Sequence, residues 1–564
     1  MCKWIWLWLA AGLLVWPNAG TAQSFDVLIR GGRVMDGSGN PAFYADIGIK
    51  KGKIVAVGRL SRARARETIN ATGLLVVPGF IDIHTHADEP RRVDKGLRSN
   101  DAQRRAAPNM VMQGITTVVV NQDGRSAWPI AEQRNTMEKL GIGPNAILLV
   151  GHGTVRRRVM GEDFRRPATA DEIQTMRKLV RQAMQEGARG MSAGLEYVPG
   201  RWSTTDEVVA LVEEIVPFGG VFISHQRSEG PDPMWYWPSQ DSAGPPTLLD
   251  AVMETIEIGE RTGATVVASH IKAKGAHYWG SSHAAIQLIE RARARGVDIW
   301  ADQYPYNTSG SDGNTVLIPR WVFRDEGGSP AGQTEVVDYA AKLRNVLGDP
   351  QRERNLRRDI AHEIRRRGGP ENVVVFEYPD SSFIGRSLAE LAGRFGVSPV
   401  DMAIKIQLEG DASRPGGARI RGFSMWEGDI EAYMRQPWTA TCTDGAIALP
   451  EDGPVHARFY GTFPRKIRRY ALERKAITLE NAIRSSTSLP AQILGLRDRG
   501  MIREGFWADI AILNLDAIRD RATFFEPHQY PEGVEYVLVN GQFVVKKGKL
   551  TWALPGKVLT GKEF

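Results

Sequence analysis

Short apolar runs recur along this chain, and several end in a side chain that can bind a metal ion. Residues 76–83 form a β-branched and apolar stretch typical of a buried strand, and His84 and His86 follow it at positions i and i+2. Side chains alternate along a strand, so these two imidazoles leave its end on the same side. The spacing predicts half of a metal site at this strand terminus.

Three later apolar runs end in the same way, at His225, His270 and Asp444. Catalytic groups gather at the carboxyl ends of the strands in a parallel barrel. Four imidazoles and a carboxylate make a nitrogen and oxygen ligand set that suits zinc or a similar divalent ion. We therefore predict a metal site from these three residues together with His84 and His86, in preference to histidines scattered over core and surface.

The two chain ends differ from the middle in their pattern. Both ends carry short apolar runs separated by glycine turns, and Asn540-Gly541 between two such runs predicts a hairpin. The middle alternates helical and strand patterns. Residues 169–184 place a capping box at Thr169 and Glu172 before apolar residues at helical spacing. Such alternation predicts a parallel α/β architecture.

These patterns predict a small β domain built from residues 23–77 and 496–564, which holds a central barrel in residues 78–495. Between residues 307 and 373 the alternation lapses, and several arginines follow in its second half. We interpret this stretch as an insertion with at least one basic helix. Two roles stay open for it, a cover over the site and a solvated helix face unrelated to substrate.

The first 22 residues have the pattern of a secretory signal peptide. Lys3 precedes an apolar stretch of about thirteen residues, and small residues then lead to an expected cleavage site after Ala22. That stretch is too short for the alternative, a membrane-spanning anchor. We expect a secreted or periplasmic protein with no stable membrane insertion after cleavage. Cleavage also removes Cys2 and leaves Cys442 as the only cysteine, which excludes an internal disulfide.

Composition adds little to this picture. The 564 residues, with 42% hydrophobic and 24% charged side chains, suit one large globular domain plus a smaller one. The formal charge of +7 suits an anionic substrate, a wall or membrane surface, or simply a soluble basic surface. No recognition motif accompanies it, so we expect no nucleic-acid partner. The oligomeric state stays open.

Several motifs resemble those of the amidohydrolase superfamily, and most closely those of the N-acyl-D-amino-acid deacylases, or D-aminoacylases. Residues 78–86 and 505–510 carry the superfamily pattern. The segments more specific to the deacylases are 114–119, 151–156, 194–200, 269–272, 304–306 and 456–465. The resemblance covers most of the chain. It implies a (β/α)8 TIM-like metal-dependent hydrolase barrel with a small β-sandwich domain formed by both chain ends.

The resemblance also implies roles for the candidate ligands. His84 and His86 match the first-strand ligands of one metal position, and His225 and His270 match those of the other. Asp444 matches the aspartate that binds metal and shuttles the proton. The implied cofactor is Zn²⁺, as one or two ions, with another divalent metal as the alternative.

The implied substrate is a small-molecule N-acyl amino acid, hydrolysed to a carboxylate and a free D-amino acid. Lys272, Tyr304 and Arg458 fall where similar enzymes hold the substrate carboxylate, with Tyr306 as a near alternative to Tyr304. Arginine pairs with a carboxylate through two parallel hydrogen bonds, which makes Arg458 the best candidate for this contact. The implied mechanism uses metal-activated hydroxide, with Asp444 as general base and then general acid.

The chain departs from the family in one turn. D-aminoacylases often have Gly-Asn-Cys-Gly there, with a cysteine that can bridge metals, whereas residues 121–124 read Asn-Gln-Asp-Gly. Asp123 is either a hard oxygen ligand or a turn residue. Glu196 is either a further carboxylate ligand or a residue that supports the ligands. His152 is either a group that polarises the carbonyl or a satisfied core histidine.

Three functions are compatible with these residues. The leading hypothesis is the deacylase, and the second is a dipeptidase or cyclic-amide hydrolase on the same scaffold. The third is a non-catalytic binding protein, which is disfavoured because all five expected ligands are present. Only a substrate panel separates the first two, because fold and metal site are common to both.

Overall fold

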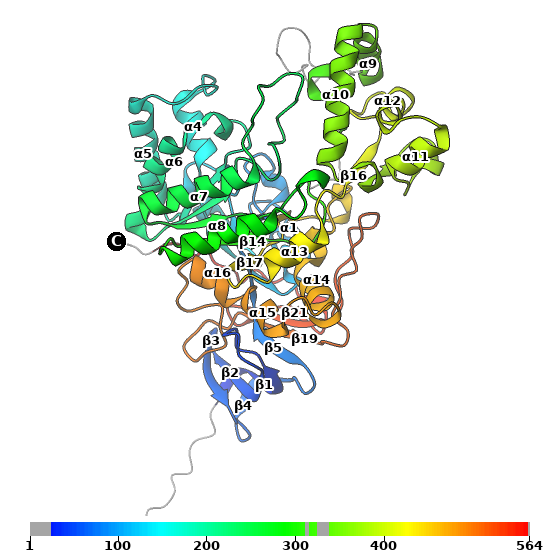
Figure 1. Ribbon diagram of the computed structural model, residues 1–564. Coiled ribbons are helices and arrows are strands. Elements are labelled where there is room, and N and C mark those ends of the chain that lie inside the picture. Colours follow the sequence, from blue (N-terminus) through cyan, green and yellow to red (C-terminus); the bar gives the residue numbers. More distant parts are fainter. Residues whose placement is uncertain (1–23, 311–314, 324–337, 562–564) are drawn as a thin grey trace, which may run out of the picture.

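The computed structural model describes residues 24–310, 315–323 and 338–561 (Figure 1). A central barrel carries a β domain at one end and an α-rich unit beside the other. The predicted signal peptide, residues 1–22, lies outside the described residues. Within the described ranges, no helix is long and apolar enough to cross a membrane.

Eight parallel strand positions form the barrel. β6, β8 and β9 pair in one sheet, β10 to β14 pair with β17 in another, and β9 and β10 are one strand interrupted at Leu149. The short strands β7 (Thr85–His86) and β18 (Gly445–Ala446) pair in parallel and join the last position to the first. The remaining bounds are β6 (Phe80–Asp82), β8 (Ile115–Val120), β9 (Asn145–Leu148), β10 (Val150–Gly151), β11 (Gly190–Gly194), β12 (Val221–His225), β13 (Thr265–Ala268), β14 (Ile299–Gln303) and β17 (Thr439–Thr441).

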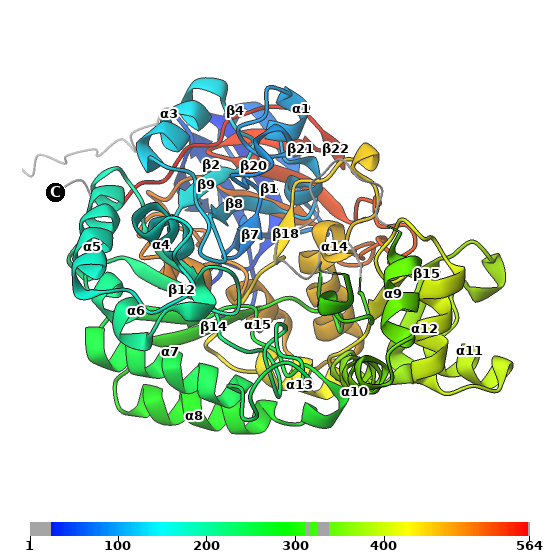
Figure 2. The same cartoon turned by 90° about the horizontal axis from the view of Figure 1, so that it is seen from above.

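Helices cover the outer face of this barrel (Figure 2). α5 begins at the predicted capping box, where the Glu172 N–H donates to Thr169 Oγ1 over 3.3 Å and the Thr169 N–H donates to Glu172 Oε2 over 2.7 Å. Its Met176, Val180 and Met184 are buried, as their spacing predicts. The main helices are α3 (Ile130–Leu140), α4 (His152–Met160), α5 (Ala170–Gln185), α6 (Thr205–Val212), α7 (Leu248–Thr262), α8 (Ser282–Ala294), α13 (Glu427–Met434), α14 (Arg458–Arg465), α15 (Leu479–Arg484) and α16 (Ser488–Ile493).

Both chain ends build the small β domain. Its strands pair in the order β22-β21-β20-β19-β5-β1-β2-β3, with β4 also paired to β1. Residues from both ends, such as Ile29 and Ile510, share one buried cluster, and the predicted Asn540-Gly541 hairpin joins β20 to β21. The bounds are β1 (Ser24–Val34), β2 (Phe43–Lys50), β3 (Lys53–Gly58), β4 (Arg64–Asn70), β5 (Leu75–Pro78), β19 (Ile510–Leu513), β20 (Val534–Val539), β21 (Gln542–Lys546) and β22 (Lys549–Leu550).

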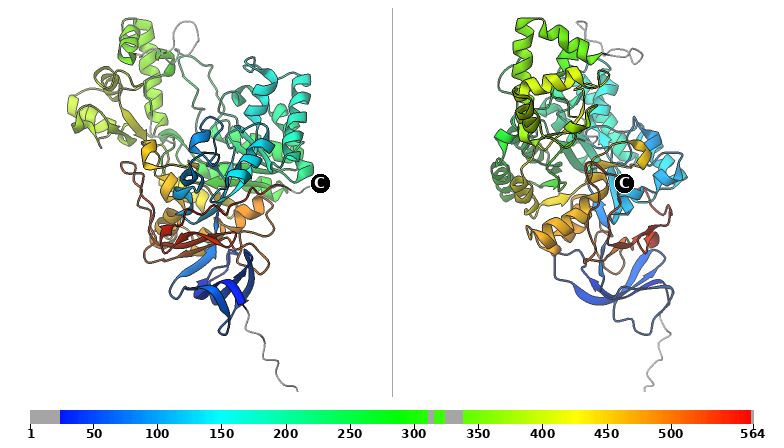
Figure 3. Two further views of the ribbon diagram at one scale, coloured as in Figure 1. Left: turned by 180° about the vertical axis from the view of Figure 1, so that it is seen from behind. Right: turned by 90° about the vertical axis from the view of Figure 1, so that its right-hand side faces the viewer.

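The α-rich unit projects beside the barrel mouth (Figure 3). It has a buried core of its own, which runs from Leu317 to Ile420. The unit therefore continues past residue 373, where the sequence pattern placed the end of the insertion, because β15 pairs antiparallel with β16 and closes it. Its elements are α9 (Tyr339–Leu347), α10 (Pro350–Arg366), β15 (Val373–Glu377), α11 (Leu388–Phe395), α12 (Pro399–Glu409) and β16 (Arg419–Gly422).

Candidate metal centre and active site

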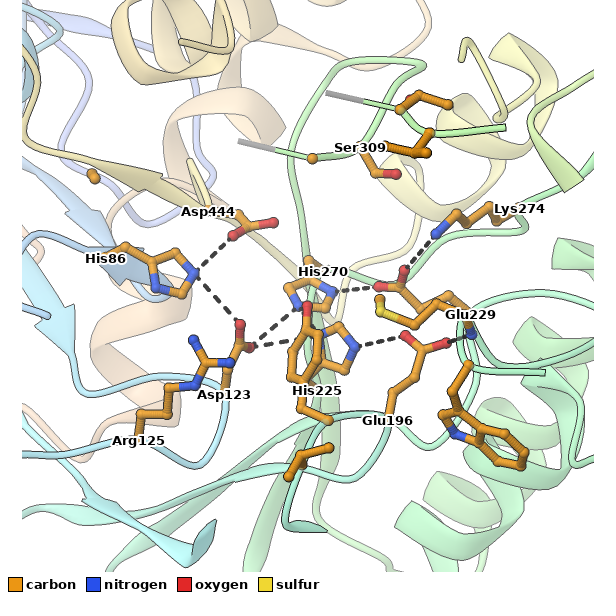
Figure 4. Close-up of a pocket in the computed structure, with 18 of the residues that line it drawn as sticks. His86, Asp123, Arg125, Glu196, His225, Glu229, His270, Lys274, Ser309 and Asp444 are labelled. Carbon is orange, nitrogen blue, oxygen red and sulfur yellow. Dashed lines mark hydrogen bonds and ion pairs between the residues drawn. The ribbon is translucent and has the colours of Figure 1, made fainter. Parts of the chain in front are cut away.

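The five ligands predicted from the sequence, together with Asp123, meet at the carboxyl ends of the barrel strands. Figure 4 shows all of them except His84. They come from five strands: His84 and His86 follow β6, Asp123 follows β8, His225 ends β12, His270 follows β13 and Asp444 follows β17. Their donor atoms, with one further carboxylate, form three overlapping groups compact enough to hold a metal ion, namely His84–His86–Asp444, His84–Asp123–His270 and His225–Glu229–His270.

Asp123 lies between the two pairs of histidines. Its Oδ1 is 3.6 Å from His84 Nε2, 3.5 Å from His225 Nδ1 and 3.7 Å from His270 Nε2. Its Oδ2 is 3.6 Å from His86 Nε2. The carboxylate thus faces ring nitrogens from both expected metal positions, and with His84 and His270 it forms one of the donor groups compact enough to hold a metal ion.

Several donor atoms in this group face one another and lack an ordinary protein partner. His225 Nδ1 and His270 Nε2 are 2.9 Å apart. His84 Nε2 and Asp123 Oδ1 are buried and have no hydrogen-bond partner among the described residues. Leaving a buried polar atom unsatisfied costs about 1–3 kcal/mol, more for a charged group. A divalent cation held by these atoms satisfies all of them at once, so the donor set fits a metal.

A buried carboxylate outside the predicted set fixes two of the ligands. His84 Nδ1 lies 2.6 Å from Ser269 Oγ, and that hydroxyl donates to Asp302 Oδ2 over 2.8 Å. The other oxygen, Oδ1, accepts the backbone N–H of His270 over 2.6 Å. Because the hydroxyl proton points at the carboxylate, Ser269 accepts from the His84 Nδ1–H and leaves Nε2 as a lone pair for a metal.

Carboxylates also bond to the remaining two histidines, His225 and His86, at the ring nitrogen that faces away from Asp123. Glu196 Oε2 lies 3.0 Å from His225 Nε2, and Glu196 Oε1 accepts the backbone N–H of Met234 over 2.5 Å. Glu89 bonds to His86 Nδ1 in the same way. The structure therefore places Glu196 as a residue that supports a ligand, the second of its two predicted roles, and outside the donor groups for the metal.

An acidic residue absent from the sequence analysis lies behind His270. Glu229 Oε1 is 3.2 Å from His270 Nδ1, and the carboxylate pairs with the ammonium of Lys272 and lies 3.6 Å from that of Lys274. Burial alone raises the pKa of Glu229, but Lys272 and the nearby histidines hold it well below its usual value. Lys272, expected at the substrate carboxylate, lines the cavity but is held by this carboxylate.

Arg458 and Tyr304 present free donors beside the metal donor groups. Arg458 Nη2 is 3.0 Å from Asp444 Oδ2, and its guanidinium carbon is 4.6 Å from the ring centre of Tyr304. Arg458 Nε and Nη1 and the Tyr304 hydroxyl are buried without a hydrogen-bond partner among the described residues. The alternative, Tyr306, does not line the cavity, and its hydroxyl lies 3.4 Å from the Ala457 carbonyl.

The two carboxylates that face the histidines stay ionised. Burial by itself raises the pKa of each, because it penalises the charged form. For Asp444 the guanidinium of Arg458 is the largest opposing cause and brings the pKa below its ordinary value. For Asp123, the nearby imidazoles of His225, His270 and His84 bring the pKa well below that value. Both carboxylates are therefore negatively charged at neutral pH and able to accept hydrogen bonds or to hold a cation.

Three site residues have left-handed backbone conformations. The φ angles are 57° at Asp123, 35° at His270 and 47° at Asp444. Such a conformation costs a non-glycine residue on the order of 1–3 kcal/mol, and it persists where the surrounding structure holds it in place. Here it turns the side chain at the end of each strand toward a common centre.

The donor groups lie at the base of a cavity of about 1180 Å³. The α-rich unit contributes Ile318, Trp321 and Arg366 to its wall. The insertion therefore forms part of the wall of the cavity.

Sequence reasoning missed Glu89, Glu229 and Asp302. No local sequence pattern identifies Glu229 or Asp302 as neighbours of the ligands. Glu89 lies three residues after His86, but that spacing indicates contact only in a turn or helix. His152 does not line the cavity; it is buried and pairs with Glu207 over 2.9 Å, so it is a core histidine.

An eight-position parallel barrel with imidazole and carboxylate donors at its carboxyl face defines a metal-dependent hydrolase of the TIM-barrel type. The model of the amidohydrolase family matches residues 67–213 and 385–545. The chain belongs to this family and, within it, to the D-aminoacylases, as its motifs indicate. It is accordingly a hydrolase of carbon–nitrogen bonds other than peptide bonds.

Two relatives match nearly the whole chain. It is 32% identical to an N-acyl-D-glutamate deacylase of Alcaligenes xylosoxydans xylosoxydans, over 95% of this chain and 97% of the relative. It is 31% identical to a D-aminoacylase of the same organism, over 95% of this chain and 98% of the relative.

Solved structures agree with the sequence relatives. An N-acyl-D-glutamate deacylase from Bordetella bronchiseptica, complexed with zinc and a phosphonate inhibitor, superposes with a TM-score of 0.70 at 28% identity, over 96% of this chain and all of that one. A D-aminoacylase structure gives a TM-score of 0.70 at 29% identity, over 95% of this chain and all of that one. A D-hydantoinase at 15% identity and a TM-score of 0.54 shares the fold alone.

Proposed function

We propose that this enzyme hydrolyses the amide bond of N-acyl-D-amino acids and releases a carboxylate and a free D-amino acid. The observation that carries the proposal is the pairing of Arg458 with Asp444. Arg458 keeps guanidinium N–H groups without a protein partner among the described residues, and these suit a substrate carboxylate. They lie directly beside Asp444, whose carboxylate faces the metal donor groups. The full-length similarity to deacylases supports the same interpretation.

The proposed cofactor is zinc, as one or two ions. His84, His86 and Asp444 would hold one position, His225 and His270 the other, with Asp123 facing both. Imidazole and carboxylate donors suit Zn²⁺. When bound, zinc acts as a Lewis acid that polarises the scissile carbonyl and lowers the pKa of water.

Asp444 is the proton carrier of the proposed mechanism. Its Oδ1 is 3.1 Å from His86 Nε2, so one oxygen faces the metal donors while Oδ2 accepts from Arg458. Asp444 takes a proton from the attacking water as the new carbon–oxygen bond forms. It returns that proton to the amide nitrogen as the carbon–nitrogen bond breaks, which lets the amine leave.

Arg458 and Tyr304 orient the substrate in this scheme. The free Nε and Nη1 of Arg458 and the Tyr304 hydroxyl donate to the α-carboxylate. Both side chains are nearly fully buried, Arg458 at 3% and Tyr304 at 2% exposure, so these hydrogen bonds form away from bulk water. Fixing the carboxylate places the adjacent amide over Asp444, and proximity of this kind contributes directly to rate.

The test is amine release from matched N-acetyl-D- and N-acetyl-L-amino acids by the zinc-reconstituted protein. We expect release from the D series, its loss in Asp444→Asn, and its loss on chelation with recovery when zinc returns. Asp516→Asn is the matched control, because Asp516 is an exposed aspartate far along the chain from the ligands. No release from either series refutes the proposal and moves the substrate toward dipeptides or cyclic amides.

We also propose that the protein is exported. The support is the N-terminal pattern of a basic residue, a short apolar stretch and small residues before Gln23. Sequencing the N-terminus of the protein recovered from the periplasm or medium tests this. A chain that begins at Gln23 is the expected result, and a chain that retains Met1 in the cytoplasm contradicts it.

A further inference from the structure

Arg125 is a cation of the cavity wall that no carboxylate of the described residues neutralises. It follows the turn that carries Asp123, and Figure 4 shows it beside that residue. Its guanidinium carbon is 5.5 Å from the ring centre of Tyr197. Among the described residues, this ring contact is the one polar or aromatic contact of its side chain, and no carboxylate pairs with its guanidinium.

Several other basic residues of the same wall are paired with carboxylates, whereas Arg91 and Arg92 of that wall are exposed to solvent. Arg157 pairs with Glu162 over 2.8 Å, and Lys272 pairs with Glu229. Arg458 shares Asp444. Each of these cations has a protein carboxylate that offsets its charge, whereas the charge of Arg125 is available to a molecule in the cavity.

The backbone at Arg125 is held firmly. The Gly124 N–H donates to Ser192 Oγ over 3.1 Å, the Gly124 carbonyl accepts the Thr154 N–H over 3.0 Å, and the Arg125 N–H donates to Gln122 O over 3.0 Å. A Cβ at Gly124 would lie 2.8 Å from a backbone nitrogen of a neighbouring strand, so the turn fits closely against the barrel. A guanidinium on a fixed base loses less entropy when it binds a partner.

Arg125 and Arg458 pack on different aromatic rings of the site. Arg458 packs on Tyr304, next to Asp444. Arg125 packs on Tyr197, whose ring centre is 4.2 Å from that of His225. The metal donor groups contain both Asp444 and His225, so a substrate whose amide lies over them has two guanidinium groups within the same cavity.

We propose that Arg125 binds a second negatively charged group of the substrate, so that the preferred substrate is a dicarboxylate. One carboxylate is the α-carboxylate on Arg458, and the other belongs either to the amino-acid side chain or to the acyl group. The inference rests on the proposed deacylase function and adds its charge specificity. Guanidinium and carboxylate form paired, charge-assisted hydrogen bonds that a neutral amide of the same shape does not match.

The experiment compares kcat/KM within two isosteric pairs. N-acetyl-D-glutamate against N-acetyl-D-glutamine tests the side chain, and N-succinyl-D-methionine against its succinamide analogue tests the acyl group. We expect a preference of roughly 10- to 100-fold for the charged member of one pair, the size of a charge-assisted hydrogen bond. In Arg125→Gln the ratio within that pair should fall close to one. In Arg157→Gln, whose arginine already has a partner, the ratio should stay as in the wild type.

Two results would overturn the inference: no charge preference in either pair, or a preference that survives in Arg125→Gln. An equal loss of kcat/KM on the charged and the neutral member of a pair also overturns the inference. Such a loss would show that the charge of Arg125 acts only on the nearby Asp123. If the wild type turns over none of these compounds, the deacylase proposal fails, and calorimetric binding of the same pairs still tests Arg125. Tighter binding of one charged member, lost in Arg125→Gln, supports it, and equal binding refutes it.

Discussion

Replacing Asp302 by asparagine reverses a hydrogen-bond chain that ends on a metal ligand. In the native chain the Ser269 hydroxyl donates to Asp302 and accepts from His84 Nδ1–H. The amide nitrogen of asparagine donates where the carboxylate oxygen accepted. Ser269 must then turn its proton toward His84 Nδ1, which moves the imidazole proton to Nε2, the nitrogen that faces the metal position.

The structure indicates how large the effect should be. Asp302 is fully buried, and its contacts of 2.8 Å to Ser269 and 2.6 Å to the His270 backbone leave little room to adjust. Removing a partner behind a metal ligand typically costs about 10- to 100-fold in metal affinity, or ~1.4–2.7 kcal/mol. We expect this loss at the position that uses His84. The other position should be spared, because the carbonyl oxygen of the introduced asparagine still accepts the His270 N–H.

The assay is competition between the protein and a chromophoric chelator for zinc, read together with activity at limiting and at saturating metal. Asp302→Asn should lose affinity in one class of sites and recover much of its activity in excess zinc. Asp298→Asn is the control, because Asp298 is exposed and lies just before the start of the same strand. Unchanged zinc affinity in Asp302→Asn, with native activity at limiting metal, would show that the Ser269 relay does not set the state of His84.

Two further changes have defined outcomes. Arg458→Ala should raise KM by about 10- to 100-fold and also lower kcat, because the guanidinium both binds the substrate carboxylate and contacts Asp444. An unaltered KM on an anionic substrate would contradict the role of Arg458 in binding the carboxylate. Burial lowers the pKa of Lys466 from 10.5 to about 7, since the ammonium meets only the hydroxyls of Thr441 and Ser485 among the described residues. The unfolded chain then binds more protons between pH 7 and pH 10.5, so the stability contribution rises with pH across that window, by at most about 5 kcal/mol. Lys466→Met should therefore be more stable than the wild type near pH 7 and lose that advantage near pH 10. Melting temperatures of both proteins across this range test the prediction, and a difference that does not vary with pH refutes it.

The ligands were predictable because each one directly follows an apolar run. His84, His86, His225, His270 and Asp444 stand at strand ends, and in a parallel barrel all such ends reach the same face. A local pattern, repeated at several strands, therefore predicted that residues far apart in the chain lie close together in the fold.

The residues behind the ligands were not predictable in the same way. Asp302 lies within β14, inside a fully buried strand, and only the pairing of β14 with β13 brings it to His270 and Ser269. Glu229 lies in a loop, where no periodicity relates position to direction. The extent of the α-rich unit was underestimated for a related reason, because the pairing of β15 with β16 spans a long separation.

The arrangement of the β domain has a consequence for synthesis. β5 pairs with β19, and roughly 430 residues separate the end of one from the start of the other. At about 5–20 residues per second, a ribosome needs roughly 20–90 s to deliver the partner strand. Throughout that interval Val76 and Val77 lack their β19 partner on one side, and this edge stays open even after the last barrel strand, β17, has been made. The nascent chain thus exposes an unpaired, aggregation-prone edge until β19 is made, and chaperones that cover such edges would act on β5 within the first eighty residues.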